Sequence, residues 1–411
     1  MLGMAGILVW FVVFSAARGD SAFIDEAPHQ DVIEGIVEGK WIIPEQIPML
    51  PGYHWLMALA NLAFGSSLYA SRAFTLLLSL LGVWFYSNAA KRMYGRDARA
   101  LPLLYAFLPI LFHYTGMVYT DAASACFVVG GLWAHVSRRF WAAALMMALA
   151  CLMRQTNVIW TAFFVAWRLL EIWEEWSAVP AEERESLYAH LRRSWLPHMI
   201  PYFTIIGGMG IYILLRGSVL SGDVKGNRPQ FNIGVMYTLA FLALLLWFPI
   251  WLERLSSEWR AMFCALKSRP MRACALAVAL AGGLSVLAVS FSNWHPWTQA
   301  PFFLSNRALE AMDHSLFVRV VGAVCLVGAA VLVFRFWKSR SNRRCLALLG
   351  LFTLVFAAVH PLADPRYLLL PFVFSDFLAG YSMRQQLQLA IWYFSICMVM
   401  GPLIASGAIL W

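Results

Sequence analysis

The chain has 411 residues, of which 61% are hydrophobic and 13% are charged. So few charged residues cannot cover the surface of a water-soluble globule of this length. The composition therefore excludes a soluble domain and predicts an all-α polytopic membrane protein. We interpret the net charge of +9 as a topological signal rather than a nucleic-acid footprint, and we expect no nucleic-acid partner.

Apolar segments long enough to cross a bilayer recur along the chain. Because about 20 helical residues span the hydrocarbon core, we expect one transmembrane domain over residues 1–411 with about 13 helices. Most of the 31 Lys and Arg residues fall at one set of helix ends, which favours a cytoplasmic N-terminus. The expected spans are 2–18, 68–88, 101–119, 120–137, 139–153, 157–173, 199–216, 233–252, 273–291, 316–337, 344–360, 366–381 and 388–411.

Two connections between these spans are distinctive. The first outer loop, residues 19–67, opens with Asp25 and Glu26 and contains an apolar stretch, residues 53–64, that is too short to span. We expect this stretch to form an interfacial helix. The largest inner loop, residues 174–198, has an apolar stripe at helical spacing, which predicts an amphipathic helix on the cytoplasmic surface.

Ionisable side chains gather at the outer ends of the expected helices. Such groups are costly near lipid and mark functional sites. A transporter would instead place them at mid-membrane depth between paired halves with broken helices, so this alternative is disfavoured. On the outer side lie Asp25, Glu26, Asp121, Arg154, Asp223, Lys225, Arg228, His295, Arg307, Asp364 and Arg366.

Carboxylates and cations on one face suit the transfer of a sugar from a polyprenyl phosphate. A carboxylate takes the proton of the acceptor hydroxyl, while cations hold the departing phosphate. Attack from the side opposite the phosphate inverts the anomeric carbon. We favour Asp25 as this base, with Glu26 as the alternative base or the residue that orients the loop; both could also simply solvate it. The groups assigned to the phosphate are Arg154, Lys225, His295, Arg307 and Arg366.

Several of these side chains also have simpler interpretations. Arg366 could be a snorkelling arginine, and Asp121 could be a helix N-cap. Trp41 and Tyr53 could stack on sugar rings or belong to an interfacial aromatic belt. The chain has neither an Asp-x-Asp motif nor a Walker-type glycine loop, which disfavours a nucleotide-sugar enzyme. A divalent metal is compatible with the chain but is not implied.

Short motifs along the chain occur in an order typical of one known family. The chain resembles the dolichyl-phosphoglucose-dependent α-1,2-glucosyltransferases, which add the last glucose to the lipid-linked oligosaccharide of N-glycosylation. The likeness runs from about residue 20 to 372, and order and number of the motifs make it specific. The motifs are Asp25-Glu26-Ala27-Pro28-His29, Glu38-Gly39-Lys40-Trp41, Leu50-Pro51-Gly52-Tyr53, Tyr119-Thr120-Asp121, Arg154-Gln155-Thr156-Asn157, Gly222-Asp223-Val224-Lys225, His295-Pro296, Asn306-Arg307 and Pro365-Arg366-Tyr367.

The resemblance implies a GT-C fold, a dolichyl-type polyprenyl-phosphate glucose donor, a lipid-linked or other glycan acceptor, and inverting transfer. It places the site on the lumenal or periplasmic face, in the endoplasmic reticulum or in a bacterial inner membrane. The lack of an Asn-x-Ser/Thr sequon favours a bacterial relative. The alternative is a related transferase of mannose, arabinose or an aminosugar. The residues expected to bind substrate are His29, Trp41, Tyr53, Asp121, Gln155, Asn157, Asp223, Asp364 and Tyr367.

Overall fold

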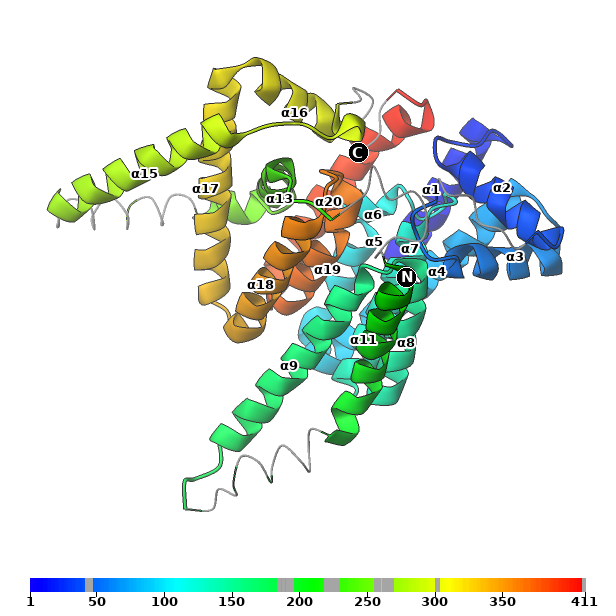
Figure 1. Cartoon of the computed structure of the whole chain (residues 1–411), viewed down its shortest axis with the longest axis horizontal. Helices are drawn as coiled ribbons and strands as arrows, with labels where there is room; N and C mark the ends of the chain where they lie inside the picture. Colours follow the sequence, from blue (N-terminus) through cyan, green and yellow to red (C-terminus); the bar gives the residue numbers. More distant parts are fainter. Residues whose placement is uncertain are drawn as a thin grey trace.

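The computed structural model describes residues 1–40, 47–182, 186, 189, 196–217, 229–254, 260, 270–299 and 304–408. Within these ranges every regular element is a helix, which confirms the predicted all-α class. In Figure 1, α2 and α3 lie at one edge of the helical bundle and α15 extends away at the other. The longer helices are α1 (Leu2–Arg18), α2 (Glu26–Val37), α3 (Gly52–Phe64), α4 (Leu68–Tyr94), α7 (Thr120–Val136), α8 (Phe140–Met153), α9 (Asn157–Ser177), α11 (Leu196–Arg216), α13 (Ile233–Leu246), α15 (Pro270–Ser290), α16 (Leu304–His314), α17 (Leu316–Lys338), α18 (Arg343–Val359), α19 (Leu369–Leu378) and α20 (Met383–Ala405).

Several of these helices are long and apolar enough to cross a membrane. Four described segments meet both conditions, namely Leu68–Ala98, His198–Arg216, Leu316–Lys338 and Met383–Ala405. Ile233–Leu246 and Phe248–Arg254 form a further candidate that is bent by 71°. The chain is therefore an integral membrane protein, while the count of about 13 spans stays a prediction.

The expected span 101–119 is not one helix. It divides into α5 (Leu101–Ala106), α6 (Pro109–Phe112) and a series of turns. Pro109 donates no amide hydrogen bond, and Leu108 before it is extended, with ψ of 112°, as the residue before a proline prefers. The break brings Tyr114 and Tyr119 into the interior of the bundle, where both rings are buried.

The first outer loop is more helical than its polar sequence suggests. Besides the apolar helix α3, residues Glu26–Val37 form α2, which buries Val32, Ile33 and Ile36 on one face. These apolar residues recur at helical spacing, so their burial offsets the polar opposite face. Asp25 therefore lies at the start of a packed helix rather than in an open loop.

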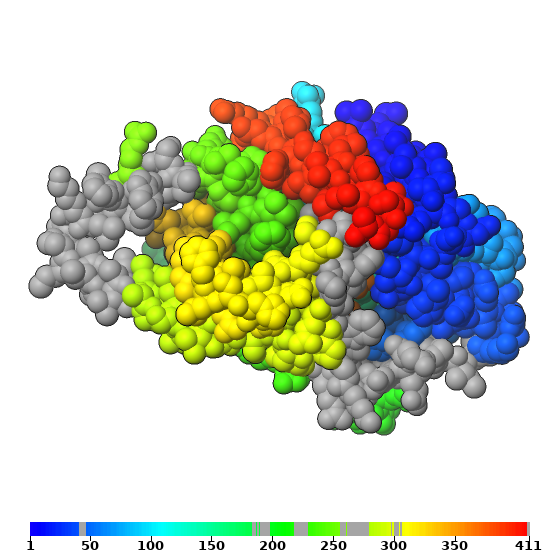
Figure 2. All heavy atoms as spheres, turned by 90° about the horizontal axis from the view of Figure 1, so that it is seen from above, coloured from blue at the N-terminus to red at the C-terminus, as the bar shows by residue number. Residues whose placement is uncertain are grey.

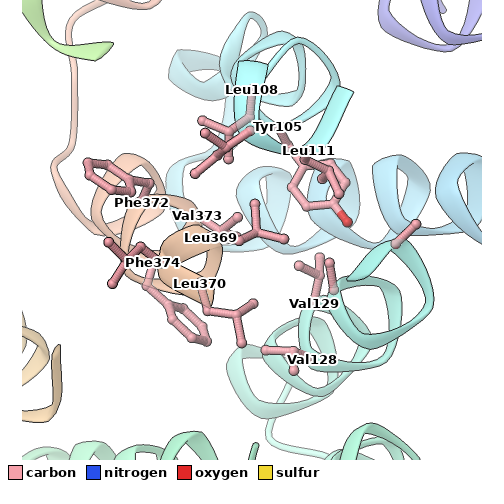
Figure 3. Close-up of a cluster of buried hydrophobic side chains, with 14 of the residues drawn as sticks. Tyr105, Leu108, Leu111, Val128, Val129, Leu369, Leu370, Phe372, Val373 and Phe374 are labelled. Carbon is pink, nitrogen blue, oxygen red and sulfur yellow. The ribbon is translucent and has the colours of Figure 1, made fainter. Parts of the chain in front are cut away.

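Helix α19 forms the centre of the bundle, and all ten of its residues are buried. Figure 3 shows its apolar side chains meeting those of α5, α6 and α7, with Leu369 and Leu370 directed towards Leu111 and Val128. The short helix η3 (Pro365–Leu368) leads directly into α19. This packing fixes the position of Arg366 and Tyr367 relative to α7.

The first and last helices lie side by side. In Figure 2 the blue N-terminal segment borders the red C-terminal one. The guanidinium of Arg18 donates to the Ile404 carbonyl at 3.2 Å, and Trp10 packs near Gly401. The C-terminal end of α1, from which the first outer loop starts, is thereby held against the bundle.

Candidate active site

Asp25 and Arg366, which are far apart in sequence, form an ion pair. Arg366 Nη1 donates to Asp25 Oδ2 at 3.5 Å, and the Asp25 side chain remains 47% exposed. Arg366 also binds Asp364 Oδ2 through Nε and Nη2, at 2.8 and 2.6 Å. The rings of Tyr114 and Tyr119 flank its guanidinium at 5.7 and 5.3 Å. The arginine is thus fixed, while the Asp25 carboxylate is accessible.

A second arginine–carboxylate pair lies beside the first. Arg154, which follows α8, donates to Asp121 Oδ2 at 3.0 Å and to Thr120 Oγ1 at 2.9 Å. Its guanidinium also lies 4.8 Å from the ring centre of Tyr367, the residue after Arg366. Asp121 Oδ1 is buried and has no hydrogen-bond partner among the described residues, so one acceptor oxygen is unsatisfied.

A small cavity separates the two arginines. It measures about 20 Å³ and is lined by Asp121, Arg154, Arg366 and Tyr367, with Trp160 and Phe356 on its apolar side. This volume accommodates a water molecule but not a sugar. Charged groups therefore surround an enclosed space that has to widen before it admits a larger ligand.

Glu26 has surroundings quite different from those of its neighbour Asp25. Its side chain and that of Arg72 are fully buried and bind each other twice, at 3.0 and 2.6 Å. The backbone amides of Val118 and Phe23 complete the set of donors to Glu26, at 2.8 and 2.9 Å. With four donors on a buried carboxylate, Glu26 joins the loop to α4 and to the segment before α7.

The backbone immediately before this pair is strained. Ile24 has φ of 53°, a left-handed conformation that a β-branched residue rarely adopts. Such a residue costs on the order of 1–3 kcal/mol and persists only where its neighbours fix the chain. The buried bonds of Glu26 and the hydrogen bond from the Asp25 amide to Tyr119 Oη, at 3.1 Å, provide that constraint.

The Leu50-Pro51-Gly52-Tyr53 motif packs against the end of α8. Gln155 donates to the Pro48 carbonyl at 2.8 Å and accepts from the Leu50 amide at 3.3 Å. A Cβ on Gly52 would lie 2.7 Å from the carbonyl oxygen of Leu152, so only glycine allows this approach. These contacts hold the Leu50–Tyr53 segment of the first outer loop against the residues that precede Arg154.

Two histidines form a buried pair behind the site. His29 Nδ1 and His54 Nε2 lie 2.9 Å apart, and one must donate while the other accepts. Burial, together with His54 and the cations Arg154 and Arg366, lowers the pKa of His29 to about 3. Burial lowers the pKa of His54 to about 4. Both imidazoles are therefore neutral at physiological pH.

This pair should make the protein sensitive to acid. The folded pKa values lie below the ordinary 6.5, so the unfolded chain binds more protons as the pH falls from 6.5 towards 4. At pH 5 each ring should cost on the order of 2 kcal/mol of stability. The Tm measured between pH 7.5 and pH 5 should fall less for His54→Gln than for the wild type. Equal slopes for the two proteins would contradict the neutral pair.

The structure places the remaining predicted residues as follows. Tyr53 is buried and contacts Thr75 at 3.3 Å, and Asn157 binds Ser124 and the Ala150 carbonyl at 2.8 and 2.7 Å. His295 is buried, whereas Arg307 is exposed on α16. Trp41, Asp223 and Lys225 lie outside the described residues, as does most of the expected amphipathic helix within 174–198.

Four residues at the site were not among the sequence candidates. These are Arg72, Tyr114, Tyr119 and His360, whose ring centre lies 4.1 Å from that of Tyr367. Arg72 had a usable signal, because a charge within an apolar span needs a partner. In the described part of the chain, no three His, Cys, Asp or Glu side chains are grouped so that they could hold a metal.

Sequence comparison identifies relatives of known activity. A model of the DIE2/ALG10 family matches residues 20–377. The Dol-P-Glc:Glc(2)Man(9)GlcNAc(2)-PP-Dol alpha-1,2-glucosyltransferase of Yarrowia lipolytica is 23% identical, over 90% of this chain and 86% of that protein. Its namesake in Candida glabrata is 24% identical over 37% of this chain, and the one in Kluyveromyces lactis is 26% identical over 56%. These two matches span only 31% and 46% of the relatives' own lengths.

Solved structures of ArnT from Cupriavidus metallidurans are similar over nearly the whole chain. The apo form has a TM-score of 0.46 and 14% identity. The match covers 98% of this chain and 77% of the ArnT chain. The form bound to undecaprenyl phosphate has a TM-score of 0.44 and 16% identity. This match covers 99% of this chain and 77% of the ArnT chain.

Proposed function

The chain belongs to the DIE2/ALG10 family, and from this premise we propose that it transfers glucose from a polyprenyl-phosphate donor to a glycan hydroxyl. The relatives' names support a dolichyl-type donor, an α-1,2 linkage and a lipid-linked oligosaccharide acceptor. The proposal includes the GT-C fold. The observation that carries it is the accessible Asp25 carboxylate 3.5 Å from Arg366, beside a second, partly buried arginine, Arg154.

In this proposal Asp25 is the general base. Its exposed carboxylate accepts the proton of the acceptor hydroxyl as that oxygen attacks the anomeric carbon. The bond from the anomeric carbon to the phosphate oxygen breaks on the opposite side, so the configuration inverts. Glu26 makes four buried hydrogen bonds and holds the loop, which leaves Asp25 as the carboxylate that an acceptor can reach.

Arg154 and Arg366 would hold the departing phosphate. Each guanidinium presents a planar fork of donors and retains its charge near lipid. Asp25, Asp121 and Asp364 offset these two cations, so the cluster has one net negative charge. An anionic donor therefore needs a further cation, and we assign this part to Lys225 of the Gly222–Lys225 motif.

We place the reaction on the non-cytosolic face, which is lumenal in the endoplasmic reticulum and periplasmic in a bacterium. The excess of Lys and Arg at the opposite helix ends supports this side. Since the donor's lipid chain stays in the membrane, its phosphate reaches protein groups near the interface. Asp25 is the N-cap of α2, and Arg366 lies in the first turn of η3, so both are at helix ends rather than at mid-helix depth.

Purified protein in lipid nanodiscs can test this function directly. We expect transfer of labelled glucose from a synthetic polyprenyl-phosphate glucose to a lipid-linked glycan, with the product linkage read by NMR. Polyprenyl-phosphate mannose and arabinose serve as matched donors. Preferential use of the mannose or arabinose donor would show that glucose is not the transferred sugar. No transfer from any of the three donors would overturn the proposed class of enzyme.

Replacing Arg154 by lysine should weaken use of the donor. Lysine retains the charge but cannot bind Asp121, Thr120 and a phosphate through one planar fork. Loss of a hydrogen bond to a charged group costs about 1.5–3 kcal/mol, so kcat/KM for the donor should fall about 10- to 100-fold. Arg139→Lys, at an exposed arginine before α8, is the control. A kcat/KM of Arg154→Lys equal to the control's would argue against phosphate binding here.

A further inference from the structure

A large apolar hollow lies between α13, α17, α18 and α19. Its volume is about 520 Å³, and its wall includes Ala240, Trp247, Val333, Trp337, Leu354 and Phe372. The volume falls within the range of about 300–1,000 Å³ that is usual for ligand sites. No step proposed above uses this space.

The hollow ends at a basic opening where α17 turns into α18. A second depression is lined by Ala330, Phe334, Arg335 and Lys338. Ala330 and Phe334 also line the hollow. Both Arg335 and Lys338 are exposed. The apolar space thus continues to a surface of positive charge.

Further cations lie beside this opening. Arg340 and Arg254 stack on the ring of Phe336 at 4.1 and 5.0 Å, and Arg254 donates to Ser339 Oγ at 3.3 Å. The 17 residues of α18 place this opening about 25 Å from His360, which follows the helix and contacts Tyr367. It is therefore at the opposite end of the bundle from Asp25.

Two side chains in the wall of the hollow have a polar atom without a partner. Trp337 Nε1 and Thr353 Oγ1 are buried, and no described residue hydrogen-bonds either of them. Buried donors are nearly always satisfied, so these two atoms are exceptions. The indole N–H can only donate, and no described residue supplies its acceptor.

We propose that this hollow binds an anionic glycerophospholipid from the cytoplasmic leaflet. An acyl chain would fill the apolar space, and the phosphate would lie between Arg335 and Lys338. An ester carbonyl would accept from Trp337 once the indole turns towards the space. Basic pockets between membrane helices on this side suit anionic head groups. The ester carbonyl distinguishes this ligand from a polyprenyl phosphate, which has no such acceptor.

Photocrosslinking in nanodiscs tests the proposal. The probes are phosphatidylglycerol and phosphatidylcholine that bear the same diazirine acyl chain, and labelled peptides are mapped by mass spectrometry. We expect phosphatidylglycerol to label residues 326–337 and 347–354 about tenfold more than phosphatidylcholine. Equal labelling by the two lipids, or stronger labelling by a diazirine polyprenyl phosphate, would overturn the proposed ligand.

Two matched pairs of variants separate binding from folding. Arg335→Gln with Lys338→Gln should reduce labelling about tenfold, whereas Lys91→Gln with Arg92→Gln, at exposed basic residues ending α4, should not. Ala330→Phe should block the hollow, whereas Val321→Phe on the lipid-facing side of α17 should leave it open. Unchanged labelling in Arg335→Gln/Lys338→Gln or in Ala330→Phe would refute the site.

Discussion

Asp25→Asn should reduce glucose transfer by about 10²–10⁴-fold, the range that a positioned general base contributes. Asparagine retains the shape of the side chain and can still contact Arg366, but it cannot take a proton from the acceptor. KM for the lipid donor should change little, because the phosphate is assigned to Arg154, Arg366 and Lys225. Steady-state rates with a synthetic polyprenyl-phosphate glucose measure both quantities.

Asp20→Asn provides the control for this variant. Asp20 is exposed in the same outer loop, five positions before Asp25, so the two substitutions remove the same charge from neighbouring positions. Its rate should match the wild type. Wild-type turnover by Asp25→Asn would remove Asp25 as the base.

The sequence was informative about which charges lie at the site, because a charge near lipid needs a partner. Asp25, Asp121, Arg154, Asp364 and Arg366 were all placed at outer helix ends. The structure joins them in three ion pairs, Arg154 with Asp121 and Arg366 with both Asp25 and Asp364. The pairing itself could not be read from the chain. It depends on how α2, α7 and α19 pack, and hydrophobic periodicity does not encode that arrangement.

Other features depend on individual contacts that no pattern shows. Gln155 and Asn157 were expected to bind substrate, whereas their described bonds join the loop after Ile47 and helices α7 and α8. Residues 101–119 have the hydropathy of a span, yet Pro109 divides them. Adjacent Asp25 and Glu26 look alike in sequence, and only the fold buries one and exposes the other.

Arg72→Met should destabilise the protein by about 3–5 kcal/mol, because it leaves the buried Glu26 carboxylate without its cation. The arginine also donates to the carbonyls of Gly19 and Ser21 at 2.7 and 2.8 Å, so the turn before Asp25 loses its anchor. We therefore expect a lower Tm in detergent and a loss of transfer activity. Arg92→Met, at an exposed arginine in the same helix, should change stability by less than about 0.5 kcal/mol.

A double-mutant cycle distinguishes a buried ion pair from simple packing. Glu26→Gln alone should also destabilise, because it leaves the Arg72 charge buried and unpaired. The combined variant should then be more stable than the sum of the two single effects predicts, by about 0.5–3 kcal/mol. Additive losses would mean that the two side chains stabilise the loop independently. In that case the position of Asp25 would depend on the Tyr119 hydrogen bond and the Arg366 contact instead.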